Sequence, residues 1–119
     1  MTDKKSPEGD DTESTLKAFH EVVNMTPARI EHWLDTDESK RVGYKSAEGG
    51  ESVGHHSGRR IIEILKKKKA DLDEADVAHM RKVIGYVHRH SAQRPDGDVR
   101  DTNWRYSLMN WGHDPLGRA

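Results

Sequence analysis

The chain has 119 residues, of which 20 are basic and 21 acidic, and its net charge is −1. This length corresponds to one domain with or without tails, because domains typically run ~50–200 residues. Only 32% of the residues are hydrophobic, which allows a small core and excludes a large one. No apolar run approaches the ~18–20 residues of a membrane-spanning helix, and no signal peptide is recognised. The absence of cysteine excludes disulfides, thiol catalysis and thiolate metal sites, so we expect a cytoplasmic protein.

The first part of the chain is predicted to form a tail and two short helices. Residues 1–12 are polar and acidic. They bury too little surface to offset the entropy of ordering, so we expect a disordered tail. Apolar residues at helical spacing predict a first helix over about 13–24. Thr26 as N-cap and Pro27 as first helical residue then predict the start of a second helix.

The middle of the chain is rich in glycine. Residues 35–57 contain four glycines and many serine and glutamate residues, which is typical of a long loop. Within this stretch we expect residues 43–56 to be mobile. Ser57 predicts the N-cap of a third helix that runs to about Lys69.

Two further helices are predicted in the C-terminal half. Asp73 is the expected N-cap of a fourth helix, which carries the clearest apolar stripe of the chain and ends near Ser91. A short fifth helix covers about 102–111 and is ended by Gly112. The sequence therefore predicts an all-α domain over residues 13–116, built as a small bundle of four to five short helices.

A basic run lies inside this otherwise neutral protein. Residues 58–69 contain six cations against Glu63 alone, a net of +5. Clustered Lys and Arg bind nucleic-acid phosphates by releasing counterions, and Arg89 would extend the patch on the next helix. The alternative is a solvated face whose lysines favour the negative end of the helix dipole. We expect non-catalytic DNA binding through the basic helix 57–69, with these contact residues: Arg59, Arg60, Lys66, Lys67, Lys68, Lys69, Arg81 and Lys82.

The eight histidines give no metal-ligand pattern. His79 and His88 are nine residues apart and point to opposite sides of one predicted helix, so they lack the i, i+4 spacing of helical ligands. We expect no bound metal and no cofactor. Ser57 lies close to His55 and His56 in sequence alone, so we expect no enzymatic activity.

The aromatic C-terminal segment has two interpretations. Trp104 and Trp111 are seven residues apart and share a helical face, with Leu108 between them. They either cover the core of a small domain or contact a base or a protein partner. The rival to DNA binding is therefore a protein–protein interaction module that uses this Trp-rich segment or the 43–56 loop.

Charge geometry separates the two hypotheses. A contiguous basic face favours DNA, whereas neutralisation of that face by acidic side chains from residues 35–51 or 71–76 favours a protein partner. The residues of this expected face are Arg59, Arg60, Lys67, Arg81 and Lys82. An enzyme would instead need a pocket that holds at least two of His55, His56, His79 and Arg105.

Four segments of the chain together resemble a known family. They fall within residues 22–34, 52–65, 79–86 and 104–115, and the last, Trp-Arg-Tyr-Ser-Leu-Met-Asn-Trp-Gly-His-Asp-Pro, is the most specific. Over about residues 16–116 the chain resembles a family of small, mostly actinobacterial proteins known as domain of unknown function 3140. Some members carry the label DNA-binding, so the resemblance implies DNA binding without a mechanism or site residues.

Overall fold

The computed structural model describes residues 7–42 and 52–117, with side chains from residue 12 onward, and these residues form helices and loops without a strand. The α-helices are α1 (Pro7–Val22), α2 (Pro27–Leu34), α3 (Asp37–Arg41), α4 (Val53–Leu65), α5 (Glu74–Ser91) and α6 (Asn103–Asn110), and a 3-10 turn, η1 (Lys69–Asp71), lies between α4 and α5. The predicted all-α class is therefore confirmed for these two stretches. None of the helices in them is long and apolar enough to cross a membrane.

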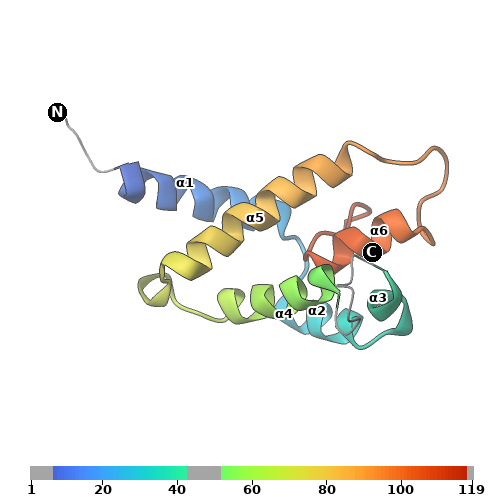
Figure 1. Ribbon diagram of the computed structural model, residues 1–119, viewed down its shortest axis with the longest axis horizontal. Helices are drawn as coiled ribbons and strands as arrows, with labels where there is room; N and C mark the ends of the chain where they lie inside the picture. Colours follow the sequence, from blue (N-terminus) through green and yellow to red (C-terminus); the bar gives the residue numbers. More distant parts are fainter. Residues whose placement is uncertain (1–6, 43–51, 118–119) are drawn as a thin grey trace.

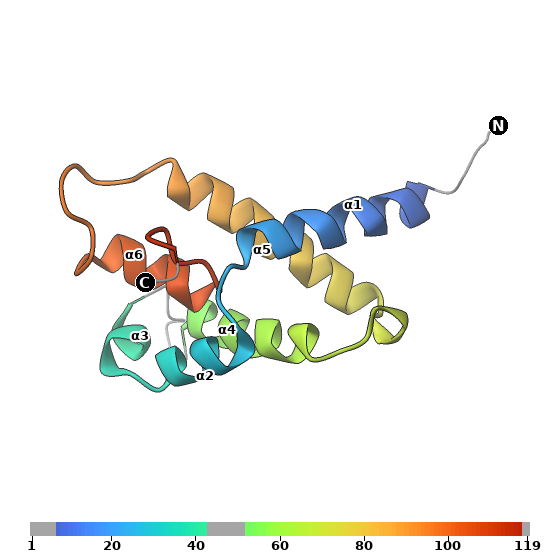
Figure 2. The ribbon, with the colours of Figure 1, turned by 180° about the vertical axis from the view of Figure 1, so that it is seen from behind.

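Two helix pairs and α6 enclose one core. α1 packs on α5, α2 packs on α4, and α6 contacts α2, α4 and α5. Figure 1 and Figure 2 show α1 and α5 crossing on one side, with α2 and α4 running together on the other. Each of these five helices contributes a fully buried apolar residue to the core, namely Phe19, Ile30, Ile61, Met80 and Leu108.

Side-chain caps fix the starts of the helices that the sequence predicted best. Thr26 Oγ1 accepts a hydrogen bond from the Arg29 N–H at 3.2 Å, and Pro27 follows as the first residue of α2. At the start of α5, Asp73 and Asp76 each accept a hydrogen bond from the other's backbone N–H, at 2.8 and 3.1 Å. This reciprocal capping box satisfies two donors that the first turn of a helix leaves unpaired. Both predicted starts are confirmed.

Two elements extend into stretches that were expected to be irregular. α1 begins at Pro7, so residues 7–12 of the expected tail are helical, whereas its residues 1–6 lie outside the described residues. Proline is favoured at the first helical position because its missing N–H has no partner there in any case. α3 lies in the stretch that was expected to be a loop, where Thr36 caps it by accepting from the Ser39 N–H at 3.1 Å.

The boundaries of α4 also differ from the prediction. Ser52, and not Ser57, is the N-cap, because its Oγ accepts from the His55 N–H at 3.0 Å. Residues 52–56 of the expected mobile loop therefore form the start of α4, and the rest of that prediction, residues 43–51, lies outside the described residues. α4 ends at Leu65, so the four lysines follow the helix and do not lie on it.

The Trp-rich segment covers the core. Its Trp104 and Trp111 are 8% and 4% exposed. Gly112 ends α6 in the left-handed region with φ 77°, where glycine is favoured. Its carbonyl accepts from the Asn24 N–H at 3.1 Å, which ties the C-terminal segment to the junction of α1 and α2.

Candidate functional site

One side of α5 carries polar and aromatic groups that face α4 and α6. Asp76 at its start contacts Arg60 of α4, and Tyr86 stacks on Trp111, which follows α6. Lys82 and Arg89 are seven residues apart and lie along the edge of this side. Four residues recur at spacings of 3, 7 and 4 and so form one stripe of the helix: Asp76, His79, Tyr86 and His90.

The carboxylate of Asp76 is 1% exposed and binds two cations of the basic run. Its Oδ2 lies 2.7 Å from Lys67 Nζ, and its Oδ1 lies 3.0 Å from Arg60 Nη1. The hydrogen bond from Lys67 lowers the pKa of Asp76 to about 2, against the effect of burial, with further help from the Asp73 N–H and Arg60. Asp76 is therefore ionised at neutral pH and neutralises part of the charge of the basic run.

His79 joins α5 to α4 through a neutral hydrogen bond. Its Nε2 and the Ser57 Oγ are 2.9 Å apart. Burial, followed by the positive charges of Arg60 and Lys82, lowers the pKa of His79 to about 4. The imidazole is therefore uncharged at neutral pH. Because Ser57 is 1% exposed, this pair is an internal contact between the two helices.

Five rings from α5 and the C-terminal segment form a continuous stack. The Trp111 ring lies 4.3 Å from the Tyr86 ring and 6.2 Å from the His79 ring, at interplanar angles of 13° and 7°. Tyr86 also stacks on His90 at 5.1 Å, and His90 stacks on Trp104 at 6.3 Å. These five residues are the ring stack, which gives this part of the molecule an aromatic wall held by two elements.

A cavity of about 220 Å³, the α5 cavity, lies beside the ring stack. Tyr86 and Trp111 form its aromatic side, and Lys82 and Arg89 bring positive charge. No carboxylate in residues 12–42 and 52–117 forms an ion pair with either cation. The other lining residues come from the start of α4 and from α6: Val53, Gly54, Ser107 and Asn110.

The lysines predicted to contact nucleic acid have different surroundings. Asp76 holds Lys67, as described above. Lys69 pairs with Glu13 of α1, whereas Lys66 and Lys68 are exposed in the turn that follows α4. The run of four lysines therefore does not present a single uniform charge to solvent.

The predicted arginines and Lys82 also lie in different places. Arg59 lines a cleft of about 330 Å³ beside α2, together with Glu31. Arg81 lines a cavity beside α1 that also includes Glu74, whereas Lys82 lines the α5 cavity. Acidic side chains therefore line the same cavities as Arg59 and Arg81. Asp76 pairs with Arg60 and Lys67, whereas Lys82 has no such pair among the described residues.

The residues that an enzymatic pocket was expected to bring together have separate partners. His55 Nε2 donates to the Leu34 carbonyl at 2.7 Å, and His79 is bonded to Ser57. Arg105 Nε donates to Asp114 at 3.0 Å. Within the described part of the chain, no group of three His, Asp or Glu side chains is placed to hold a metal ion.

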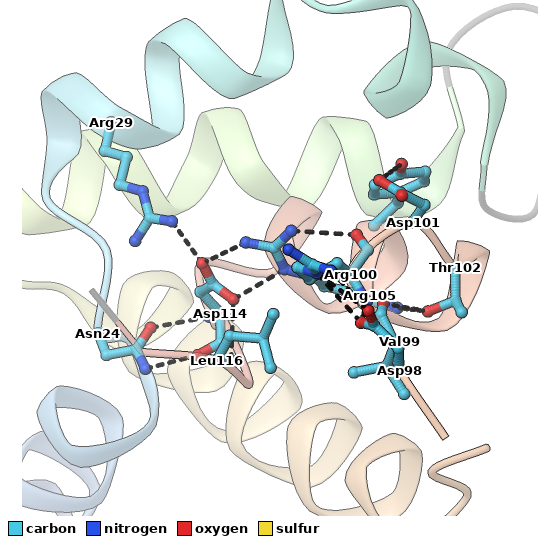
Figure 3. A network of polar contacts seen from close by, with 11 residues as sticks. Asn24, Arg29, Asp98, Val99, Arg100, Asp101, Thr102, Arg105, Asp114 and Leu116 are labelled. Carbon is cyan, nitrogen blue, oxygen red and sulfur yellow. Dashed lines mark hydrogen bonds and ion pairs between the residues drawn. The ribbon is translucent and has the colours of Figure 1, made fainter. Parts of the chain in front are cut away.

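A second buried carboxylate, that of Asp114, organises the C-terminal segment (Figure 3). It is 0% exposed, receives two hydrogen bonds from Arg105 at 3.0 and 2.9 Å, and pairs with Arg29. The Asn24 side chain binds the backbone N–H and carbonyl of Asp114 at 2.8 and 3.0 Å. Burial opposes ionisation, but the hydrogen bonds from Arg105, the Leu116 N–H and Arg29 outweigh it and lower the pKa of Asp114. This Asp114 network joins α2 and α6 to the end of the fold.

Comparison with known proteins gives a family and no function. The sequence pattern of the family described as "Protein of unknown function (DUF3140)" matches residues 18–109. The chain belongs to this family. The matched range includes Lys82, Tyr86 and Arg89, and it ends before Trp111 and Asp114. No curated protein and no solved structure matches the chain.

Sequence reasoning missed the partners that define the site. Acidic side chains from residues 71–76 were expected only as possible neutralisers of the basic face, so Asp76 was not singled out and Tyr86 was not connected with Trp111. The spacing of residues in the sequence predicts the stripe on α5. It does not predict which side of α4 faces this stripe, because that depends on packing between distant segments. A Cβ on Gly58 would lie 2.7 Å from the Asn110 carbonyl oxygen, so only glycine lets α4 approach the end of α6 this closely.

Proposed function

We propose that the chain is a non-catalytic nucleic-acid-binding protein whose main phosphate contacts are Lys82 and Arg89 of α5. The observation that supports this best is the position of these two cations beside the aromatic wall of the α5 cavity. Phosphate contacts with exposed cations supply most of the affinity for nucleic acid when binding has little sequence preference. Both cations are exposed and lack a carboxylate partner among the described residues, so their charge is left for a ligand.

The charge of this side of the molecule suits a small number of phosphate contacts. A protein that coats nucleic acid is usually basic throughout, which this chain is not. We therefore propose salt-dependent binding with little sequence preference, to nucleic acid in the cytoplasm. Four cations and two carboxylates lie on α4 and α5 or just after α4, with a formal net charge of +2: Arg60, Lys67, Lys82, Arg89, Asp76 and Glu63.

A protein partner is the second candidate. The pairing of Arg60 and Lys67 with Asp76 favours it, because acidic residues from 71–76 were expected to neutralise the basic face in that case. Such a partner would place an acidic group near Lys82 or Arg89 and an apolar side chain in the α5 cavity. Trp111 would contribute through the cavity wall, since its side chain is otherwise buried.

Fluorescence anisotropy with a labelled random-sequence oligonucleotide tests the proposal. At low salt, Lys82→Ala/Arg89→Ala should weaken binding by at least about tenfold, because two phosphate contacts are lost. The matched control, Lys17→Ala/Lys40→Ala, removes the same charge from exposed positions on α1 and α3 and should change affinity by less than about twofold. An equal loss in both variants, or no binding by the wild type at tens of micromolar, would contradict the proposal.

A further inference from the structure

We infer that Gly85 is a positioning residue for phosphate binding, because it lets the Arg89 guanidinium lie against α5 on the side toward Lys82. The inference rests on the proposed function, in which Lys82 and Arg89 are the main phosphate contacts. It adds the feature of the chain that brings these two cations together on one short stretch of a strand.

Three residues of α5 form this arrangement. Lys82, Gly85 and Arg89 recur at spacings of 3 and 4, so they share one stripe of the helix. A Cβ on Gly85 would lie 3.0 Å from Arg89 Nη1 and 3.9 Å from Arg89 Cζ. The guanidinium therefore rests on the bare backbone at Gly85, about one turn before its own Cα atom. Helical side chains lean in this direction, because each Cα–Cβ bond tilts toward the N-terminus of the helix.

Packing between helices does not explain the glycine at this position. Glycine in the middle of a helix is less stable than alanine, because it loses more conformational freedom on folding. The φ of Gly85 is not positive, unlike that of Gly112. Apart from α5's own backbone and the adjacent residues, only the Arg89 side chain of the described residues lies within 4 Å of the position of its Cβ. At Gly58, by contrast, the nearest atoms belong to other helices.

The position of the guanidinium brings the two charges closer together. Seven residues of helix separate the Cα atoms of Lys82 and Arg89 by about 10 Å along the axis. At the level of Gly85, the guanidinium is only about 4–5 Å along the axis from the level of Lys82. Both side chains line the α5 cavity. An arginine that already lies in place also loses less rotamer freedom when it binds, so the two cations are prepared for phosphates close together on one strand.

Substitution of Gly85 tests the inference without changing the charge of the protein. Gly85→Val places two methyl groups on Cβ, where the guanidinium lies, and the midpoint of thermal unfolding should not fall, because valine is at least as good a helix former as glycine. Affinity for a labelled oligothymidylate at low salt should weaken about threefold, the share of one of two contacts. Gly85→Ala should cause a smaller loss. The matched control, Ala28→Val at an exposed position of α2, should leave the affinity unchanged.

A double-mutant cycle shows whether the loss acts through Arg89. In an Arg89→Ala background, Gly85→Val should change the affinity by less than about 1.5-fold, because the guanidinium that it displaces is absent. The slope of log affinity against log salt concentration should be smaller in magnitude by about 0.7 for Gly85→Val than for the wild type, because one phosphate contact is lost while both cations remain. An equal loss of affinity in both backgrounds would overturn the inference.

The outcomes separate this inference from the proposed function. Unchanged affinity and slope in a folded Gly85→Val protein, with binding weakened in Lys82→Ala/Arg89→Ala, would overturn the role of Gly85 and leave the proposed function intact. Absence of binding by the wild type would overturn both. Circular dichroism melting identifies the variants that fold. If Gly85→Val does not fold, the same cycle with Gly85→Ala decides the question, because its single methyl group meets only the flexible end of the Arg89 side chain.

Discussion

The Asp114 network and the α5 cavity use positive charge in opposite ways. At Asp114, two guanidiniums converge on one fully buried carboxylate and join distant segments of the chain. At the α5 cavity, Lys82 and Arg89 lie beside aromatic rings with no carboxylate partner in the described residues. The number of basic residues in a segment therefore does not locate a binding site. A binding site is located by the basic side chains that form no ion pair within the fold.

The largest decrease in stability is expected from Asp114→Ala, which removes the buried carboxylate of the Asp114 network. The substitution leaves Arg29 and Arg105 without their shared buried partner and should lower the free energy of unfolding by about 3 kcal/mol. Chemical denaturation measures this loss. Oligonucleotide binding by the folded variant should match that of the wild type. A loss below about 1 kcal/mol would show that the network does not hold the C-terminal segment.

Asp76→Asn should affect both stability and binding. The change weakens the capping box of α5 and frees Arg60 and Lys67, so the free energy of unfolding should fall by about 1–2 kcal/mol. The same change removes a negative charge near Lys82, so oligonucleotide affinity at low salt should rise a few-fold. Denaturation and anisotropy on one preparation measure the two effects. Weaker binding by a folded Asp76→Asn protein would contradict the assignment of this surface to a polyanion.

The pH dependence of stability should reveal the separate contributions of His79 and Asp76, both on α5. The pKa of His79 is lowered from 6.5 to about 4, so the unfolded chain binds a proton here that the folded chain does not. Stability should therefore fall as pH decreases from about 6.5 to 4, and His79→Gln should flatten this part of the curve. The pKa of Asp76 is lowered from 3.8 to about 2, so its contribution is present above 3.8 and is lost as pH falls toward 2. Urea denaturation between pH 7 and pH 2 measures both slopes, and an unchanged upper slope in His79→Gln would contradict the assignment to this residue.

The smallest effect is expected from Asp98→Ala. Asp98 and Arg100 pair at 2.8 Å, but both side chains are exposed, by 61% and 70%. Water screens such a pair, so thermal unfolding and oligonucleotide binding should both stay unchanged within error. A clear loss of stability would contradict this expectation, because it would show that the exposed pair stabilises the fold as the buried Asp114 network does.

The parts of the fold with local signals could be predicted from the sequence. Thr26 and Pro27 marked the start of α2, and Asp73 marked the start of α5, because capping depends on residues within one turn. α3 was missed because its five residues bury only Ser39 and show no apolar period. The start of α4 was misplaced because its first turn, Val-Gly-His-His, has no apolar stripe.

The site was less predictable because its contacts join residues that are far apart in sequence. Lys82 and Arg89 were expected to extend a basic patch, and both do line the α5 cavity. The ion pair of Lys69 with Glu13 and the stacking of Tyr86 on Trp111 depend on how whole helices pack. No local pattern reports such contacts, so the sequence indicated the charge of the surface and not which part of it remains unpaired.

The salt dependence of binding tests the central claim most directly. For an oligothymidylate, the slope of log affinity against log salt concentration should be smaller in magnitude for Lys82→Ala/Arg89→Ala than for the wild type. The expected difference is about 1.4, because each phosphate contact on a single strand contributes about 0.7. The slope of the Lys17→Ala/Lys40→Ala control should equal that of the wild type. An identical slope in all three proteins would contradict the claim that Lys82 and Arg89 contact phosphates.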